Sequence, residues 1–196
     1  MGGRKNWVFW PTKCAAGALL RPIFRIETSG RENIPRESAF VLLPKHQRWE
    51  DIPLLGLAAS RPVYYVARYD LFENPLSNWF LRSLGGIPLN RQRPIESRQS
   101  IQAVIEYLRR GEGVAVFPEG TYYKNKMGPG RAGIVKIMYS RFDLPFIPVG
   151  INYSPMGIRT HVRIKFGEAV YGNSAGSVRW FLSKVMEEIK VLSGLS

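Results

Sequence analysis

The sequence predicts an α/β fold in which a mostly parallel central sheet is flanked by helices. Short apolar runs of strand type alternate with helical patterns from about residue 23 onward, and turn residues separate them. Forty-five percent of the 196 residues are hydrophobic, which is enough to bury a substantial core. We expect a single domain at residues 28–196, preceded by a short arm at residues 1–27.

The expected elements follow one another in the alternating order that such a fold requires. Strands are expected at 23–27, 39–43, 62–67, 86–89, 113–118, 146–153 and 161–167. Helices are expected at 51–60, 74–85, 94–111, 132–141 and near 175–193. Local signals mark their ends: Asp51 can cap its helix, Pro53 is tolerated in the first turn, and Gly85 and Gly111 each end a helix.

The N-terminal stretch 7–24 is apolar, but it does not reach the ~18 uninterrupted apolar residues expected of a membrane-spanning helix. Lys13 and Arg21 interrupt it, and it fits a cleavable signal peptide poorly. We expect residues 1–27 to form an amphipathic arm that lies in a membrane interface, with aromatic and leucine side chains on one side. The alternative is a helix that folds onto the domain.

The charge of the chain predicts an anionic partner. Lys and Arg number 28 against 15 acidic residues, which gives a formal net charge of +13. Nucleic acid, an acidic membrane surface and a phosphorylated substrate would each suit this charge, but no nucleic-acid-binding motif is present. Cys14 is the only cysteine, so an intrachain disulfide and a cysteine metal cluster are excluded. Two histidines far apart do not favour a zinc site.

His46 and Asp51 are a candidate reactive pair. On one continuous helix, residues five apart would point about 140° from each other, so a helix cannot pair them. A strand end, a turn and a helix start can bring them together, and the flanking sequence offers that context. An imidazole oriented by a carboxylate can take a proton from a hydroxyl. Because no serine or cysteine nucleophile motif is present, that hydroxyl would belong to a substrate. Alternatively, Asp51 merely caps a helix and His46 ends a strand.

Two other polar groups also follow expected strands. "FPEGT" at 117–121 comes after a buried strand, where α/β proteins place functional loops, and it offers the carboxylate of Glu119 and the hydroxyl of Thr121. "GGIPLNR" places Arg91 just after a short strand, and arginine holds phosphate with two hydrogen bonds. The alternatives are an ordinary turn for the first and a solvated cationic surface for the second.

The four motifs in this order resemble those of the glycerolipid acyltransferases, and most closely those of the 1-acyl-sn-glycerol-3-phosphate (lysophosphatidic acid) acyltransferase family. They are "KHQRWED" at 45–51, "GGIPLNR" at 85–91, "FPEGT" at 117–121 and "FIPVG" at 146–150. The similarity runs from about "SGRENIP" into "RIKFGEAV", so it covers most of the chain.

The resemblance implies roles for eight residues. His46 would be the general base that deprotonates the acceptor hydroxyl, and Asp51 would orient it. The acceptor and its phosphate would be bound by Arg91, Glu119, Gly120, Thr121, Arg68 and Arg131. Backbone amides nearby would stabilise the oxyanion.

The resemblance also implies the partners. The acceptor would be a lysophospholipid, most simply 1-acyl-glycerol-3-phosphate, which would give phosphatidic acid. The donor would be acyl-CoA or acyl-carrier protein, with no cofactor, no metal and no nucleic acid. The protein would be associated with an anionic membrane surface at the cytoplasmic face of the cell membrane.

Two positions depart from the family pattern. Arg48 stands where the family often has serine, and Tyr122 follows "EGT" where arginine is usual. These changes leave open another acceptor, such as another lysolipid, a lyso-ornithine lipid or a glycolipid. A second alternative is a basic membrane-binding protein without catalysis.

Overall fold

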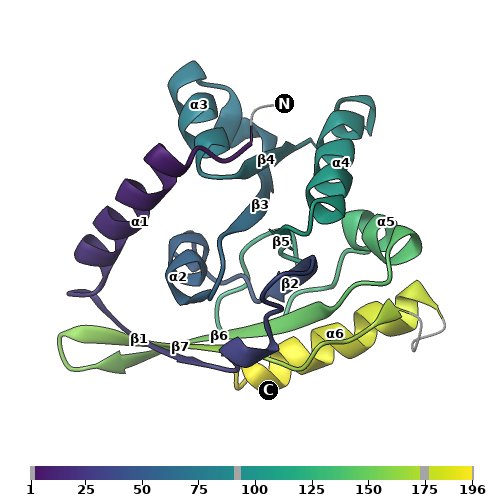
Figure 1. Ribbon diagram of the computed structural model, residues 1–196. Helices are drawn as coiled ribbons and strands as arrows, with labels where there is room; N and C mark the ends of the chain where they lie inside the picture. Colours follow the sequence, from purple (N-terminus) through teal and green to yellow (C-terminus); the bar gives the residue numbers. More distant parts are fainter. Residues whose placement is uncertain (1–2, 91–93, 173–176, 196) are drawn as a thin grey trace.

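The structure is a computed structural model that describes residues 3–90, 94–172 and 177–195. Within them, a seven-stranded sheet is covered by helices on both faces (Figure 1). The strands are β1 (Phe24–Ser29), β2 (Phe40–Pro44), β3 (Val63–Arg68), β4 (Gly86–Leu89), β5 (Gly113–Ala115), β6 (Phe146–Met156) and β7 (Arg159–Phe166). The α-helices are α1 (Asn6–Leu20), α2 (Asp51–Ala58), α3 (Pro75–Ser83), α4 (Pro94–Arg109), α5 (Gly133–Arg141) and α6 (Val178–Leu192). Two 3-10 helices are η1 (Arg31–Asn33) and η2 (Tyr69–Phe72).

The sheet is mostly parallel, as the sequence predicts. Its strand order is β1-β7-β6-β2-β5-β3-β4. Strands β6, β2, β5, β3 and β4 run parallel to one another, whereas β6 and β7 form an antiparallel pair and β1 runs parallel to β7. The carboxyl ends of β2, β5, β3 and β4 therefore meet at one edge of the sheet, which is where parallel α/β sheets place their binding sites.

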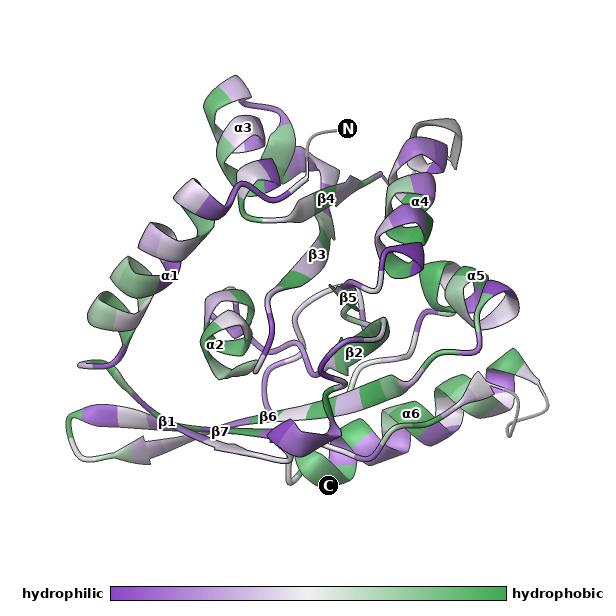
Figure 2. Cartoon of the chain, viewed as in Figure 1, coloured by the Kyte–Doolittle hydropathy of each residue, from purple (hydrophilic) through white to green (hydrophobic). Residues whose placement is uncertain are grey.

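The core lies on both faces of the sheet. Strand β2 is buried along its whole length, and it is hydrophobic along most of that length in Figure 2, as expected of a central strand in a parallel sheet. One apolar cluster packs α4, α5 and α6 against the sheet, and the other packs α2 and the end of α1 against the opposite face. Helix packing on both sides fixes the ends of the central strands in space.

The N-terminal helix α1 packs onto the domain, where it contacts α2 and α3. Val8, Phe9 and Leu20 are buried there, whereas Trp7, Trp10 and Leu19 are exposed. The apolar side chains thus lie on both sides of the helix and not on one side as expected, because one side must cover the domain. The predicted boundary between residues 27 and 28 falls inside β1, which pairs with β7 from Phe24 onward.

Among the described residues, no helix is long and apolar enough to cross a membrane.

Candidate active site

The first and third motifs meet at the carboxyl edge of the sheet. His46 follows β2 and Phe117 follows β5, and these two strands are paired in parallel register from Phe40 and Gly113. The two rings stack with their centroids 3.9 Å apart, and Tyr122 packs edge-on against the imidazole at 4.3 Å. This packing fixes the plane of the His46 ring.

His46 and Asp51 form the pair that the sequence predicts. His46 Nδ1 lies 3.0 Å from Asp51 Oδ2, and the Asp51 carboxylate is fully buried. The intervening residues turn between the end of β2 and the start of α2, so the two side chains face each other. Because a carboxylate accepts, Nδ1 is the nitrogen that donates, and the lone pair of a neutral imidazole then resides on Nε2.

Asp51 is held by donors from two parts of the chain, the turn after β2 and strand β6. Its Oδ2 accepts hydrogen bonds from the backbone amides of Gln47 at 2.5 Å and Arg48 at 2.8 Å. Its Oδ1 accepts a hydrogen bond from the Tyr153 hydroxyl at 2.6 Å. The amides belong to residues that precede α2, and the residue before the helix, Glu50, makes no side-chain cap. The simple helix-capping role for Asp51 is therefore wrong, because its carboxylate points back toward the loop and not along the helix.

Tyr153 is a proton donor that stays protonated. Burial raises the pKa of its phenol, and the neighbouring Asp51 carboxylate raises it further. The Arg48 guanidinium lies over the Tyr153 ring at 4.5 Å. The pKa of Tyr122 is also raised, first by burial and then by Asp51, but by less than that of Tyr153. Both phenols therefore stay protonated beside Asp51.

A buried ion pair lies directly behind the imidazole. Lys45 Nζ contacts both carboxylate oxygens of Glu119, at 2.9 and 2.8 Å, and both side chains are fully buried. Burial lowers the pKa of Lys45, while its hydrogen bond to Glu119 opposes that shift. Lys45 Nζ also donates to the carbonyl oxygens of His46 and Tyr123. The pair joins the first motif to the loop that follows β5.

Glu119 also accepts two backbone hydrogen bonds. Its Oε2 accepts from the His46 amide at 2.9 Å, and its Oε1 accepts from the Gly128 amide at 2.7 Å. With Lys45 on both oxygens, the carboxylate has its acceptor positions occupied by the protein. Glu119 thus shapes the site by holding the backbone at His46 and the backbone at Gly128.

A pocket opens in front of the imidazole. His46, Arg68, Gly120, Thr121 and Tyr122 supply its polar lining. Apolar side chains complete it: Ile52, Val66, Ala67, Leu71, Leu89 and Phe117. His46 is only 8% exposed, so it reaches solvent mainly through this pocket.

The structure brings together most of the residues that the sequence singled out. His46, Arg68, Gly120 and Thr121 line the pocket, and Asp51 and Glu119 lie behind it. The Arg68 side chain is nevertheless largely exposed, and its guanidinium pairs with the Asp70 carboxylate at 2.6 Å.

Two predicted arginines lie elsewhere. Arg131 is exposed and is not among the pocket-lining residues, although its amide donates to Pro118 at 2.8 Å. Arg91 lies outside the described residues.

Sequence reasoning missed three residues of the site. Lys45 directly precedes His46 at the end of an apolar run. A cation at such a position needs a buried partner, and this requirement could have pointed to Lys45. Gln47 donates from Nε2 to the Ile151 carbonyl and accepts from the Asn125 amide at Oε1, which fixes the turn. Tyr153 is 102 residues from Asp51, and no local pattern marks it. The described residues contain no group of three or more side chains suited to hold a metal ion.

Comparisons with known proteins show the family to which the chain is similar. The family model named Acyltransferase matches residues 25–152. A 1-acyl-sn-glycerol-3-phosphate acyltransferase of Borreliella burgdorferi is 31% identical over 188 residues, which cover 85% of this chain and 74% of that protein. A chloroplastic 1-acyl-sn-glycerol-3-phosphate acyltransferase of Brassica napus is 26% identical over 183 residues, covering 88% of this chain and 53% of that protein.

Another curated relative differs in its named acceptor. A lyso-ornithine lipid O-acyltransferase of Pseudomonas aeruginosa is 33% identical over 135 residues, covering 69% of this chain and 47% of that protein. The chain spans about half the length of several curated relatives that it matches.

A solved structure shows the same architecture. The crystal structure of the 1-acyl-sn-glycerophosphate (LPA) acyltransferase PlsC from Thermotoga maritima superposes with a TM-score of 0.73 at 27% identity, covering 93% of this chain and 75% of that one. The four ordered motifs, the matching family model and this shared fold lead to one conclusion. The chain belongs to the 1-acyl-sn-glycerol-3-phosphate acyltransferase family of glycerolipid acyltransferases.

Proposed function

We propose that this protein transfers a fatty acyl group from an acyl thioester to the free hydroxyl of a lysophospholipid. The acceptor we propose is 1-acyl-glycerol-3-phosphate, and the product is then phosphatidic acid. The observation that carries the proposal is the 3.0 Å contact between His46 Nδ1 and the buried Asp51, at the floor of a pocket lined by His46 itself. Membership of the acyltransferase family supports the same reaction.

In the proposed mechanism His46 is the general base. Its Nδ1–H is held by Asp51, so Nε2 takes the proton of the acceptor hydroxyl as the oxygen attacks the thioester carbonyl. The tetrahedral intermediate collapses to the ester and expels the thiolate, which takes the proton back from the imidazolium. Asp51 stabilises that imidazolium, and the two backbone amides and the Tyr153 hydroxyl hold the Asp51 carboxylate in place.

The proposed acceptor phosphate is bound by cations at the mouth of the pocket. Arg68 lines the pocket, and its exposed guanidinium can exchange Asp70 for a phosphate because a surface ion pair is weak. We propose that Arg131, and Arg91 outside the described residues, supply further cations for the phosphate. Gly120 and Thr121 are proposed to contact the acceptor directly, since both line the pocket.

The donor and the location follow from the same reasoning. We propose acyl-CoA or acyl-carrier protein as the donor, with no cofactor in the reaction. The acceptor is a membrane lipid, so we place the protein on the anionic cytoplasmic face of the membrane, where its +13 charge would favour binding.

A lyso-ornithine lipid is the second candidate acceptor. The named activity of the Pseudomonas aeruginosa relative favours it. Its ornithine headgroup carries no phosphate. Replacing Arg68 with alanine would therefore impair a phosphorylated acceptor much more than a lyso-ornithine lipid.

Removing the imidazole tests the proposed function. Purified protein is incubated with acyl-CoA and a panel of lysolipids, and the products are identified by mass spectrometry. We expect His46→Ala to lower acyl transfer at least ~100-fold, which is the usual contribution of a general base.

His161→Ala is the matched control. His161 also pairs with a carboxylate, with Nε2 at 2.9 Å from Glu27 Oε2, but it lies on β7 and does not line the pocket. We expect its turnover to match that of the wild type. Undiminished turnover in His46→Ala would remove the imidazole from the mechanism, and membrane binding without any turnover in the wild type would favour the non-catalytic alternative.

A further inference from the structure

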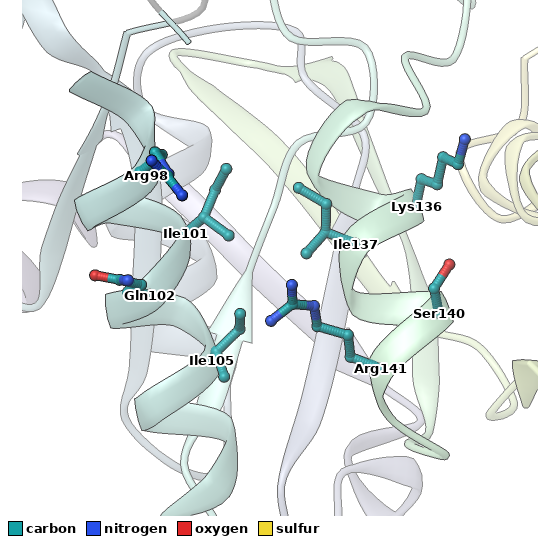
Figure 3. Close-up of a pocket in the computed structure, with 8 residues that line it drawn as sticks. All are labelled: Arg98, Ile101, Gln102, Ile105, Lys136, Ile137, Ser140 and Arg141. Atoms are coloured by element: carbon teal, nitrogen blue, oxygen red, sulfur yellow. The ribbon is translucent and has the colours of Figure 1, made fainter. Parts of the chain in front are cut away.

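A second hollow lies away from the proposed active-site pocket, between α4 and α5 (Figure 3). Its volume is about 420 Å³, which falls within the range of small-molecule binding sites. Three isoleucines form its apolar part: Ile101 and Ile105 from α4, and Ile137 from α5. In Figure 3 they lie on the facing sides of the two helices. No step of the proposed reaction uses this groove.

Every charged side chain that lines the groove is a cation. Arg98 comes from the second turn of α4, and Lys136 and Arg141 come from α5. All three are exposed, and Arg141 extends from α5 toward α4 in Figure 3. Within the part of the chain that the structure describes, none of the three forms an ion pair. Unpaired cations around an apolar floor suit a ligand with several negative charges and a flat apolar part.

One end of the groove leads to the edge of the sheet where His46 lies. Helix α4 follows β4 and helix α5 follows β5, so both helices begin at the carboxyl edge of the parallel strands. Gly133 opens α5 two residues after Arg131, whose amide donates to Pro118 at 2.8 Å. Phe117, next to Pro118, stacks on the His46 ring. An elongated ligand in the groove can therefore direct its other end toward the imidazole.

We propose that the groove between α4 and α5 binds the phosphorylated nucleotide of acyl-CoA. This inference rests on the proposed acyl-transfer function and selects one donor for it. The 3′-phosphate and the diphosphate are bound by Arg98, Lys136 and Arg141, and the adenine packs on the isoleucines. The flexible pantetheine arm then runs over the sheet edge and delivers the thioester to the acceptor hydroxyl beside His46. The helix N-termini at that edge add favourable potential for the anion.

The test measures nucleotide binding separately from turnover. Adenosine 3′,5′-bisphosphate, which is the nucleotide part of CoA without the arm, is titrated into the full chain by calorimetry. We expect binding, competition with acyl-CoA, and an affinity at least about tenfold weaker in the Arg98→Ala/Arg141→Ala variant, since each lost contact is a charge-assisted hydrogen bond. The KM for acyl-CoA should rise by the same factor while kcat stays unchanged.

Two controls isolate the groove. Arg109→Ala/Arg179→Ala removes the same net charge from exposed positions on α4 and α6 that do not line it, and its affinity for the nucleotide should be that of the wild type. Acyl-pantetheine lacks the nucleotide, so the wild type and the groove variant should use it equally well. Arg141→Lys keeps the charge and should recover part of the affinity.

Several outcomes would overturn the proposal. They are no nucleotide binding by the wild type, an equal loss in the control variant, or a KM for acyl-pantetheine that rises in the groove variant. An effect confined to acyl-carrier protein would instead make the groove a protein-docking surface, and would also reject the nucleotide. If the nucleotide binds and the groove variant weakens it while no lysolipid is acylated, the site stands and the acyl-transfer function fails.

Discussion

Asp51 is the residue on which the geometry of the proposed base depends. It orients His46, and it is itself oriented by two backbone amides and the Tyr153 hydroxyl. A carboxylate held in place by this many donors is positioned to stabilise the imidazolium that forms during proton transfer. Its donors come from the turn after β2 and from β6, which ties the orientation of the imidazole to two strands.

The Lys45–Glu119 pair gives a prediction about stability. Replacing Lys45 with methionine would leave the Glu119 carboxylate buried without its cation, and breaking one partner of a buried pair costs about 3–5 kcal/mol. We expect the free energy of unfolding of Lys45→Met, measured by urea denaturation, to fall by about that amount. Acyl transfer should fall as well, because Glu119 also holds the His46 amide.

A double variant separates the ion pair from packing. Lys45→Met/Glu119→Gln removes both charges, so it should lose less stability than the sum of the two single variants. Lys124→Met is the matched control, because Lys124 is exposed in the loop that carries Glu119. It should change the free energy of unfolding by less than ~0.5 kcal/mol. Strictly additive losses would show that Lys45 and Glu119 do not act as a pair.

Residue-level prediction succeeded where the partners are close in sequence. His46 and Asp51 are joined by a short turn between a strand and a helix, and that context is readable from the chain. Tyr153 reaches Asp51 only because β6 lies beside β2, which no local pattern encodes. Lys45 was adjacent to the motif, but its partner lies in the loop after β5.

Among the elements, β6 and α6 together support the site from behind. The Ile151 amide donates to Ser193 Oγ just after α6, and Asn152 Nδ2 donates to the Ser193 carbonyl. The Ile151 carbonyl accepts from Gln47 Nε2 in the turn that carries His46. The end of α6 therefore fixes the part of β6 that presents Tyr153 to Asp51.

The glycine of the fourth motif lies at this contact. A Cβ at Gly150 would stand 2.4 Å from the backbone carbon of Leu192, and backbone atoms cannot move aside as a flexible side chain can. We expect Gly150→Ala to lower the free energy of unfolding by about 1–3 kcal/mol or more, as overpacking does. Turnover should fall in parallel, because the strand that carries Tyr153 must shift. Thermal unfolding and acyl transfer measure the two effects.

Gly133→Ala provides the comparison at the start of α5. A Cβ there would meet nothing within 4 Å, and alanine favours a helix over glycine, so stability should be unchanged or slightly higher. If Gly150→Ala unfolds at the wild-type temperature, the fourth motif does not act through its contact with α6.

Element positions were predictable and their arrangement was not. The alternation of strands and helices follows from periodicity, and the expected helices at 74–85 and 94–111 correspond to α3 and α4. The strand order places β1 beside β7, near the other end of the chain, and β6 pairs with β7 in antiparallel register. Such pairings depend on long-range packing, which local propensity does not determine.

At the scale of the whole molecule, positive charge and exposed aromatic rings occur together near α1 and α3. Trp7 and Trp79 lie with ring centroids 6.1 Å apart, and both are exposed. Lys5 lies over the Trp79 ring and Lys13 over the Trp10 ring. The sequence indicated each part separately, and the fold joins them into one surface. Aromatic rings with adjacent cations are typical of proteins that bind at a membrane interface.

Substitution of the exposed tryptophans on this surface tests membrane binding more directly than deletion of α1 would. Deleting α1 would uncover Val8, Phe9 and Leu20, so lost binding could reflect unfolding. We expect Trp7→Ser/Trp10→Ser to keep the fold and to reduce sedimentation with anionic liposomes at least about tenfold. Each ring contributes apolar area that is buried when it enters the membrane interface. Trp180→Ser removes from α6 a ring about as exposed as that of Trp10 and should bind as the wild type does. Equal binding by all three proteins would mean that charge alone, and not this aromatic surface, holds the protein to the membrane.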